Sequence, residues 1–314
     1  MTKTVAFATL AVLALAAPLA IYPVLLMTIL CFVIFACSFN LLLGYTGLLC
    51  FGHAMFFGTA AYITGYVLKS TSLPTEIGIL VGSLSAAAMG AAVGLVAVRR
   101  TGIQFAMITF AIAQFVFFLL VKSEFTGRED GMHKIPRRAL LGFIDVSSNF
   151  SYYYFVLAVT AGCIYLFYRI VHSPFGDLLK AIRDNENRVE SLGFKPEHFK
   201  LMALTLSAGL AGLAGGLKAT VYQFATLTDA SWSISGEVIL MTLLGGLGTL
   251  TGPMFGAGVI ILLNDYLAQF GEWALISQGV ILLVVILTFR RGIVGEAVAY
   301  LSRRGIRTRR VLPA

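Results

Sequence analysis

The chain has 314 residues, of which 58% are hydrophobic and only 12% are charged, and its formal net charge is +8. A soluble domain carries about 25% charged residues, so this composition excludes an ordinary soluble protein. The apolar residues come in runs of about 18 or more, which is typical of membrane-spanning helices, and the basic residues lie at the ends of those runs. The positive charge therefore indicates membrane orientation rather than binding to nucleic acid.

The apolar runs predict an all-α integral membrane protein that forms a single transmembrane domain over residues 1–314. We place ten spans at about residues 4–20, 22–43, 47–68, 76–98, 102–121, 152–171, 199–223, 233–248, 253–270 and 273–290. With ten spans both termini lie on one side, and that side receives 16 of the 23 Lys and Arg residues. The positive-inside rule assigns it to the cytoplasm, together with a basic C-terminal tail over residues 290–314.

The first twenty residues allow two interpretations. Lys3, an apolar run from Val5 to Ala17 and small residues around Pro18 resemble a secretory signal peptide. The same residues also suit an uncleaved first span. We favour the span because, with it included, ten spans place both termini on the same side of the membrane.

A glycine-rich run at the end of the second span is the first candidate functional segment. Gly44, Gly47, Gly52 and Gly58 interrupt apolar sequence, and broken helix at membrane depth is tolerated where it is buried or lines a cavity. Such segments often mark substrate sites in transporters; the alternative is a tight cytoplasmic turn. His53 is an ionisable residue inside a span, and it either bonds a nearby carbonyl or contacts substrate.

A second glycine-rich run, Leu244–Pro253, contains Gly245 and Gly248 and echoes Leu43–Gly47 about two hundred residues earlier. Both runs follow a span and break it, as in transporters built from internal repeats. Between the two runs, Gln104 and Gln114 lie close to three helical turns apart, so they share a face. They could line a translocation path or tie helices together.

Small residues recur four apart in several spans, a spacing that lets helix backbones approach closely in lipid. The sets are Gly90 and Gly94; Ala208, Gly212 and Gly216; and Gly248, Gly252 and Gly256.

The stretch from His172 to Lys200 is the most densely charged part of the chain. Ser173 suits an N-cap, Pro174 the first helical position and Gly193 the C-terminal cap, so one amphipathic helix is predicted over 173–193. Ion pairs are expected on its polar face between Lys180 and Asp184, Asp184 and Arg188, and Arg183 and Glu186. The helix could lie in the lipid headgroups or dock a partner subunit.

Several kinds of chemistry have no counterpart in the sequence. It holds no phosphate-binding loop of the Gly-x-x-x-x-Gly-Lys-Ser/Thr type, no cluster of metal ligands and no nucleophile–base pair. Its four cysteines lie in apolar segments and are expected to be small buried residues. We therefore expect a non-enzyme without metal or cofactor, whose energy comes from another subunit or an ion gradient.

Four blocks, in order along the chain, carry a family resemblance. They are the glycine run Gly44–Tyr62, the loop Thr126–Gly131, the segment Ser173–Glu186 with its continuation to Gly193, and Leu244–Pro253. Together they resemble the branched-chain amino acid ABC transporter permeases of the LivM type. Cys50 stands where the family has Ser, and Ala60 and Arg128 stand where it has Gly, which leaves the substrate open among branched-chain amino acids, related amino acids, urea and other small solutes.

The resemblance implies a multi-pass subunit of the bacterial inner membrane. Its implied partners are a second homologous permease, two cytoplasmic ATPases and a periplasmic binding protein that delivers the substrate. It assigns the 173–193 helix to ATPase coupling, through Phe175, Gly176, Arg183, Asn185, Glu186, Glu190 and Gly193. The path candidates are Gly44, Gly47, Gly52, His53, Gly58, Gln104, Gln114, Gly245 and Gly248. The rival from another class is a self-sufficient secondary transporter with an ion near His53, Glu237 or Asp265.

Overall fold

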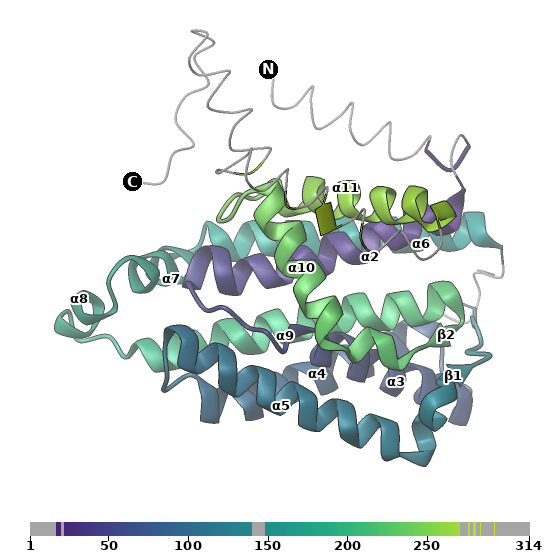
Figure 1. Ribbon diagram of the computed structural model, residues 1–314, viewed down its shortest axis with the longest axis horizontal. Helices are drawn as coiled ribbons and strands as arrows, with labels where there is room; N and C mark the ends of the chain where they lie inside the picture. The colour runs from purple at the N-terminus through teal and green to yellow at the C-terminus, as the bar shows by residue number, and fades with distance from the viewer. Residues whose placement is uncertain are drawn as a thin grey trace, which may run out of the picture.

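The computed structural model describes residues 17–19, 22–139 and 148–270, together with positions 276, 279, 280, 283 and 292. In this part of the chain the protein is almost entirely helical (Figure 1). The helices are α2 (Pro23–Asn40), α3 (His53–Ser70), α4 (Thr75–Ala97), α5 (Gly102–Lys122), α6 (Asn149–Val171), α7 (Pro174–Asp184), α8 (Glu186–Ser191), α9 (Pro196–Tyr222), α10 (Trp232–Gly245) and α11 (Gly252–Leu267).

Shorter elements join these helices. A π-helix, η2 (Leu41–Thr46), continues α2, and short 3-10 turns occupy Ala17–Leu19, Glu124–Thr126 (η3), Arg128–Asp130 (η4), Leu227–Ala230 (η5) and Ala268–Phe270. Two-residue strands β1 (Met132–His133) and β2 (Phe224–Ala225) pair antiparallel, with Met132 opposite Ala225.

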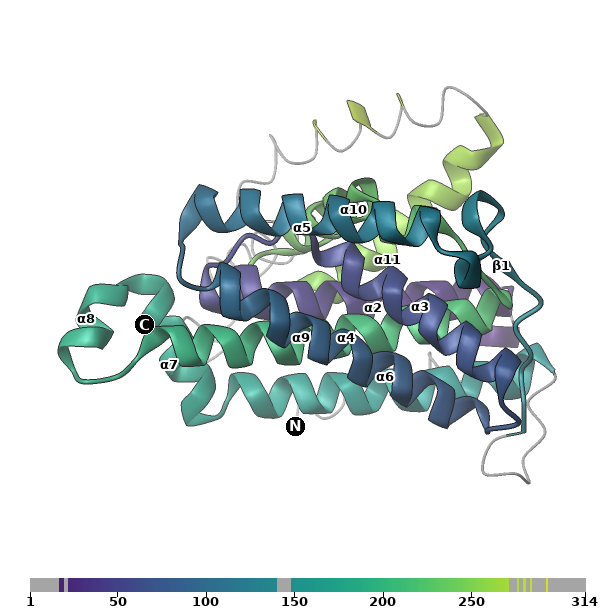
Figure 2. The ribbon, with the colours of Figure 1, turned by 90° about the horizontal axis from the view of Figure 1, so that it is seen from below.

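The long helices run side by side along the molecule, with α7 and α8 projecting beyond one end and the β1–β2 pair at the other (Figures 1 and 2). Helices α2 and α9 form the centre, since 72% and 67% of their most apolar windows are buried. The corresponding share is 33% or less for α4, α5 and α6, whose outer faces expose large apolar side chains. An apolar exterior of this extent is stable in lipid rather than in water.

Among the described residues, five helices are long and apolar enough to cross a membrane: α2 with η2, α4, α5, α6 and α9. The predicted spans at 76–98, 102–121, 152–171 and 199–223 coincide with the last four of these to within a few residues. The prediction of a continuous span from residue 47 was wrong, because the chain is irregular until α3 begins at His53. The predicted span 4–20 lies outside the described residues apart from 17–19, and 273–290 apart from four isolated positions.

Small residues allow α4 and α9 to pack closely, as their spacing predicts. A methyl group added at Gly90 would overlap the side chain of Ala208, and one added at Gly212 would overlap Ala86. The third predicted set does not share one helix, because Gly248 lies in the turn before α11 with φ +69°. All four cysteines are buried and free, as expected.

Candidate functional site

The chain between α2 and α3 enters the bundle instead of turning at its surface. Figure 1 shows residues 47–52 as a thin purple loop that leaves α2 and runs back alongside it. Leu48 and Cys50 are buried, and Gly52 lies against the backbone of Thr109. Thr109 is seven residues into α5, which places Gly52 about 10 Å along that helix. Helix α3 therefore begins inside the bundle.

A second irregular segment enters the bundle from the opposite end. After β2 the chain descends through η5 to Ala230, whose backbone touches Gly58 of α3 so closely that a side chain at Gly58 would overlap it. The first turns of α3 and α10 then meet, and the Ala54 amide donates a hydrogen bond to Ser235 Oγ at 2.9 Å. Two helix N-termini therefore come together at mid-depth, an arrangement transporters use for polar substrates.

His53 is fully buried at the start of α3. Its Nε2 lies 3.0 Å from Ser38 Oγ, and the Ser38 hydroxyl itself donates to the carbonyl of Phe35. The imidazole stacks on the Phe35 ring, with centroids 5.3 Å apart. In this conformation His53 bonds a hydroxyl rather than the carbonyl that the sequence suggested, and it is closed off from solvent.

The two glycine-rich runs meet at the end of the bundle that carries α7. Asn40 donates from Nδ2 to the carbonyl of Thr249 at 2.9 Å and accepts from the Gly248 amide at 3.1 Å. Gly44 lies beneath this contact, where any side chain would overlap Asn40 and the Gly248 amide. Similarity between the two runs alone did not predict that they touch.

The π-helix makes the Gly44 carbonyl available to a partner outside the helix. Just after η2 the Leu48 amide donates a hydrogen bond to the carbonyl of Leu42, and within η2 the Thr46 hydroxyl donates to the carbonyl of Leu41. The Gly44 carbonyl accepts a hydrogen bond from Arg183 Nη1 at 2.6 Å. Short π-segments frequently occur at functional sites, and here one joins a core helix to α7.

The predicted helix over 173–193 is in fact two helices. Ser173 caps α7 by accepting from the Gly176 amide, as predicted, but Asn185 adopts φ −162° and ends that helix. The Asn185 side chain then caps α8 by accepting from the Arg188 amide. Gly193 has φ +88° after α8, as expected for a terminal glycine. The prediction of one continuous helix was therefore wrong.

The ion pairs also differ from those predicted. Lys180 pairs with Asp177 at 2.9 Å and Arg183 with Asp184 at 3.1 Å. Glu186 pairs with Lys200 of α9 at 2.5 Å, and the Lys200 side chain is only 2% exposed. The break at Asn185 turns Glu186 toward α9, so that this pair fastens α8 to a core helix.

The other candidate residues occupy varied positions. Phe175 packs near Phe199 of α9, with ring centroids 6.2 Å apart, and Glu190 is exposed. A methyl group at Gly176 would overlap backbone carbonyls of α6, so Gly176 closes the α6–α7 corner. Among the described residues, the Gln104 and Gln114 side chains bond no other helix.

Asn40, Lys218 and Asp229 had no role assigned from the sequence. Lys218 of α9 pairs with the nearly buried Asp229 of η5, and its ammonium lies 5.5 Å from the Phe32 ring. An isolated charge is costly within the membrane, so this pair fixes the descending segment to α9. The presence of Lys218 in an apolar run was the sequence feature that could have indicated a buried ion pair.

Replacing Asn40 by alanine should destabilise the fold by about 2 kcal/mol, because the Gly248 amide and the Thr249 carbonyl would lose their buried partner. The thermal unfolding midpoint of the detergent-purified chain measures this loss. The matched control is Asn187→Ala, since Asn187 is exposed on α8. Equal midpoints for the two variants would contradict the role of Asn40 as the link between the glycine runs.

The chain is similar in sequence to known transport proteins over most of its length. Residues 21–288 match a family model described as the permease component of branched-chain amino acid transport systems. The high-affinity branched-chain amino acid permease LivM of Escherichia coli is 25% identical over 285 residues, covering 83% of this chain and 67% of its own length. LivM of Salmonella typhimurium is matched with the same identity and coverage.

A more distant match is a probable branched-chain amino acid permease, LivH, of Methanocaldococcus jannaschii, 29% identical over 137 residues and 42% of each chain. No solved structure matches the chain.

Proposed function

Since the chain belongs to the branched-chain amino acid transport permease family, we propose that it is the membrane-spanning subunit of an ABC importer in the bacterial inner membrane. It moves branched-chain or related small amino acids that a periplasmic binding protein delivers. A second homologous permease completes the membrane part, and two cytoplasmic ATPases drive it. The chain crosses the membrane about ten times, with both termini in the cytoplasm.

The observation that carries the coupling part of this proposal is the contact between Arg183 and the Gly44 carbonyl. Helices α7 and α8 project beyond the bundle (Figure 1), so a partner can push on them. Arg183 passes that displacement to η2, and the irregular residues 47–52 pass it to the first turn of α3. ATP-driven closure of the ATPases thereby moves the segment where α3 and α10 meet.

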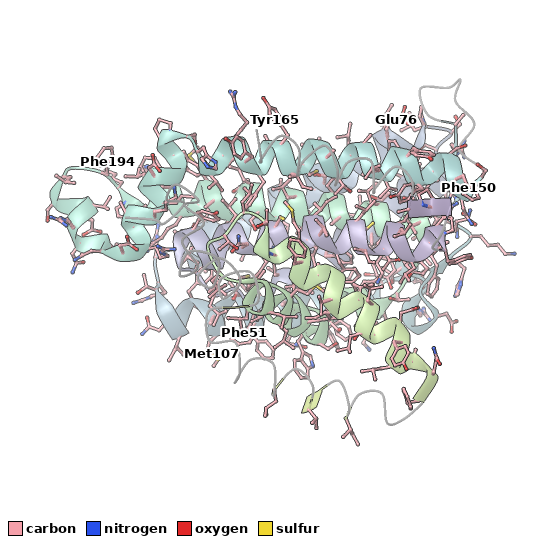
Figure 3. The ribbon with its side chains drawn as sticks, turned by 90° about the horizontal axis from the view of Figure 1, so that it is seen from above. Phe51, Glu76, Met107, Phe150, Tyr165 and Phe194 are labelled. Carbon is pink, nitrogen blue, oxygen red and sulfur yellow. The ribbon has the colours of Figure 1, made fainter. Side chains whose placement is uncertain are left out.

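The translocation path is proposed to run along the face where α3 and α10 begin. Trp232 is 62% exposed there, and the exposed Ser231 and Ser233 hydroxyls lie 2.6 Å apart. Figure 3 shows Phe51 and Met107 on one edge of the molecule. The serine hydroxyls beside the two helix N-termini support placing the aqueous path here, and the exposed apolar side chains support placing the second permease against the same face.

The proposed orientation must account for the basic residues of the outer loop over residues 122–138. Arg137 donates to the carbonyls of Thr220 and Val221, and Arg138 donates to the carbonyl of Leu68 at 3.3 Å. Arg128 pairs with Glu124. Arg137 and Arg138 are therefore held against the bundle by hydrogen bonds, and the cytoplasmic majority of basic residues supports the proposed orientation.

A mild-detergent pull-down of the chain, with mass spectrometry, tests the proposal. We expect recovery of two ATPases and a second permease, and uptake of leucine, isoleucine or valine by the complex in proteoliposomes with the binding protein and ATP. Uptake of urea instead of these amino acids would support the importer function but contradict the proposed substrate. If the chain is recovered without partner subunits and transports substrate without ATP, the proposal is wrong and the chain is a secondary transporter.

A further inference from the structure

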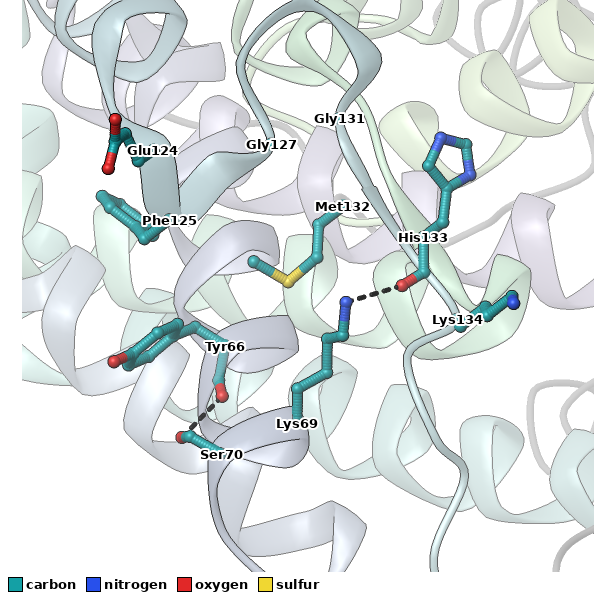
Figure 4. A pocket seen from close by; sticks show the side chains of 10 residues that line it. All are labelled: Tyr66, Lys69, Ser70, Glu124, Phe125, Gly127, Gly131, Met132, His133 and Lys134. Atoms are coloured by element: carbon teal, nitrogen blue, oxygen red, sulfur yellow. Dashed lines mark hydrogen bonds between the residues drawn. The ribbon is translucent and has the colours of Figure 1, made fainter.

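A pocket of about 530 Å³ opens between the end of α3 and the segment from Glu124 to Lys134 (Figure 4). It lies at the end of the bundle that carries the β1–β2 pair, which the proposed topology places outside the cell. Neither the glycine runs nor the α7–α8 segment reaches it. It is therefore separate from the coupling elements and the path described above.

One side of the pocket is apolar. Tyr66 and Phe125 are 51% and 45% exposed, and their rings meet edge to face with centroids 5.9 Å apart. Met132 points into the pocket from the opposite side (Figure 4). Exposed aromatic rings around a cavity are typical of sites that receive an anchor side chain from a protein partner.

The charges that remain available around the pocket are positive. Glu124 already pairs with Arg128 at 2.8 Å. Lys69 donates one hydrogen bond, to the His133 carbonyl at 3.0 Å, and its ammonium has three hydrogens to donate. Lys134 makes no ion pair with any described residue. A complementary partner would present a carboxylate beside an apolar group.

The loop that forms the pocket is held rigidly. Arg128 and Lys134 adopt φ +57° and +58°, a left-handed conformation that non-glycine residues take only when their surroundings impose it. The His133 ring packs against the Phe224 ring, with centroids 4.4 Å apart, and the Ile135 amide donates a hydrogen bond to the carbonyl of Gln223. A site arranged before its ligand arrives loses little entropy on binding.

We propose that this pocket is the docking socket for the periplasmic binding protein. An apolar side chain of that protein packs against the Tyr66–Phe125 ring pair, and a neighbouring Asp or Glu of the same surface pairs with Lys69 and Lys134. This inference rests on the proposed function, because it requires an importer that uses a binding protein. A folded protein surface with fixed side chains can match a preorganised pocket, whereas binding of fluid lipid does not require a preorganised pocket.

The test uses the complex recovered by the pull-down, reconstituted in nanodiscs of neutral lipid, and the loaded binding protein as probe. The double variant Lys69→Glu/Lys134→Glu should raise its Kd about tenfold or more. The matched control is Lys122→Glu. Lys122 is the last residue of α5, at the same end of the bundle as the pocket but not part of its lining, so this variant should keep the wild-type Kd. Phe125→Ala should also weaken binding, whereas Phe118→Ala should not.

A carbodiimide cross-linker, which joins a lysine ammonium to a carboxylate through an amide with loss of water, locates the contact directly. We expect cross-links from Lys69 or Lys134 to an acidic residue of the binding protein. Lys69→Arg/Lys134→Arg should keep the Kd within about twofold, since the charge remains, and should abolish the cross-link.

An unchanged Kd in the double glutamate variant, or cross-links confined to other lysines, would overturn the docking socket while leaving the importer intact. An effect of the variants that appears only in anionic lipid would identify a headgroup site and also overturn it. A wild-type complex that transports but binds no binding protein would instead contradict the proposed function.

Discussion

Replacing Arg183 by methionine is expected to lower ATP-driven uptake about tenfold or more, while the assembled transporter continues to hydrolyse ATP. The guanidinium group bonds the carbonyl of Gly44 at 2.6 Å, and a hydrogen bond from a charged donor contributes about 1.5–3 kcal/mol. Methionine keeps the aliphatic stem against Gly47 but removes this bond. Movement of α7 would then no longer reach η2.

Uptake of labelled substrate and ATP hydrolysis should be measured on the same proteoliposomes. The matched control is Arg188→Met, because Arg188 has the same charge on the neighbouring helix and its side chain bonds no described residue. Arg183 is preferable to Gly176 for this test, since a side chain at Gly176 would distort the α6–α7 corner. Proportional losses of uptake and hydrolysis would mean that Arg183 supports assembly rather than coupling.

Replacing Gly256 by alanine should destabilise the fold by about 3 kcal/mol, although it adds a single methyl group. The added carbon would overlap the carbonyl oxygen of Met241 on the facing helix α10. Backbone atoms cannot rotate away as a side chain can, so α10 and α11 would have to separate. The thermal unfolding midpoint in detergent should fall by several degrees.

Two residues further along α11, Gly258 provides the control for this variant. The nearest atom to an added methyl group there is a side-chain carbon of Ile29 at 4.0 Å, which is ordinary contact. Gly258→Ala should therefore unfold at the wild-type temperature. If both variants unfold at that temperature, the close approach of α10 and α11 is not needed for the fold.

The long helices could be predicted from the sequence because length and apolar composition are local properties. α4, α5, α6 and α9 begin and end within a few residues of the predicted limits. The sequence drew attention to the glycine run before α3, but the path of that run through the bundle was not predictable. The burial of Leu48 and Cys50 depends on the helices packed around them, which no local pattern describes.

The candidate site was less predictable, because its contacts join residues far apart in the sequence. Arg183 meets Gly44 across 139 positions and Asn40 meets Gly248 across 208. On α7 and α8 the regular spacing of charges predicted pairs within one helix, but the backbone of Asn185 ended that helix first. A single residue outside helical geometry therefore redirected Glu186 to Lys200.

One non-glycine residue of the outer loop adopts a backbone conformation that has a physical cost. Arg128 adopts φ +57°, a conformation that glycine takes without strain. The surrounding turn is fixed by the hydrogen bond from the Gly131 amide to the Arg128 carbonyl. Arginine tolerates this turn and adds a partner for Glu124.

The hydrogen bond from the Ala54 amide to Ser235 also sets an order of events during synthesis. Ser235 leaves the ribosome 181 residues after Ala54, so the first turn of α3 must wait without its cap while helices α4 to α9 are made. Until α10 arrives, the Ala54 amide lacks this partner at membrane depth, where an unsatisfied polar group is costly. Chains truncated before Trp232 should therefore be substrates for membrane quality-control proteases, although they already contain α2, α4, α5, α6 and α9.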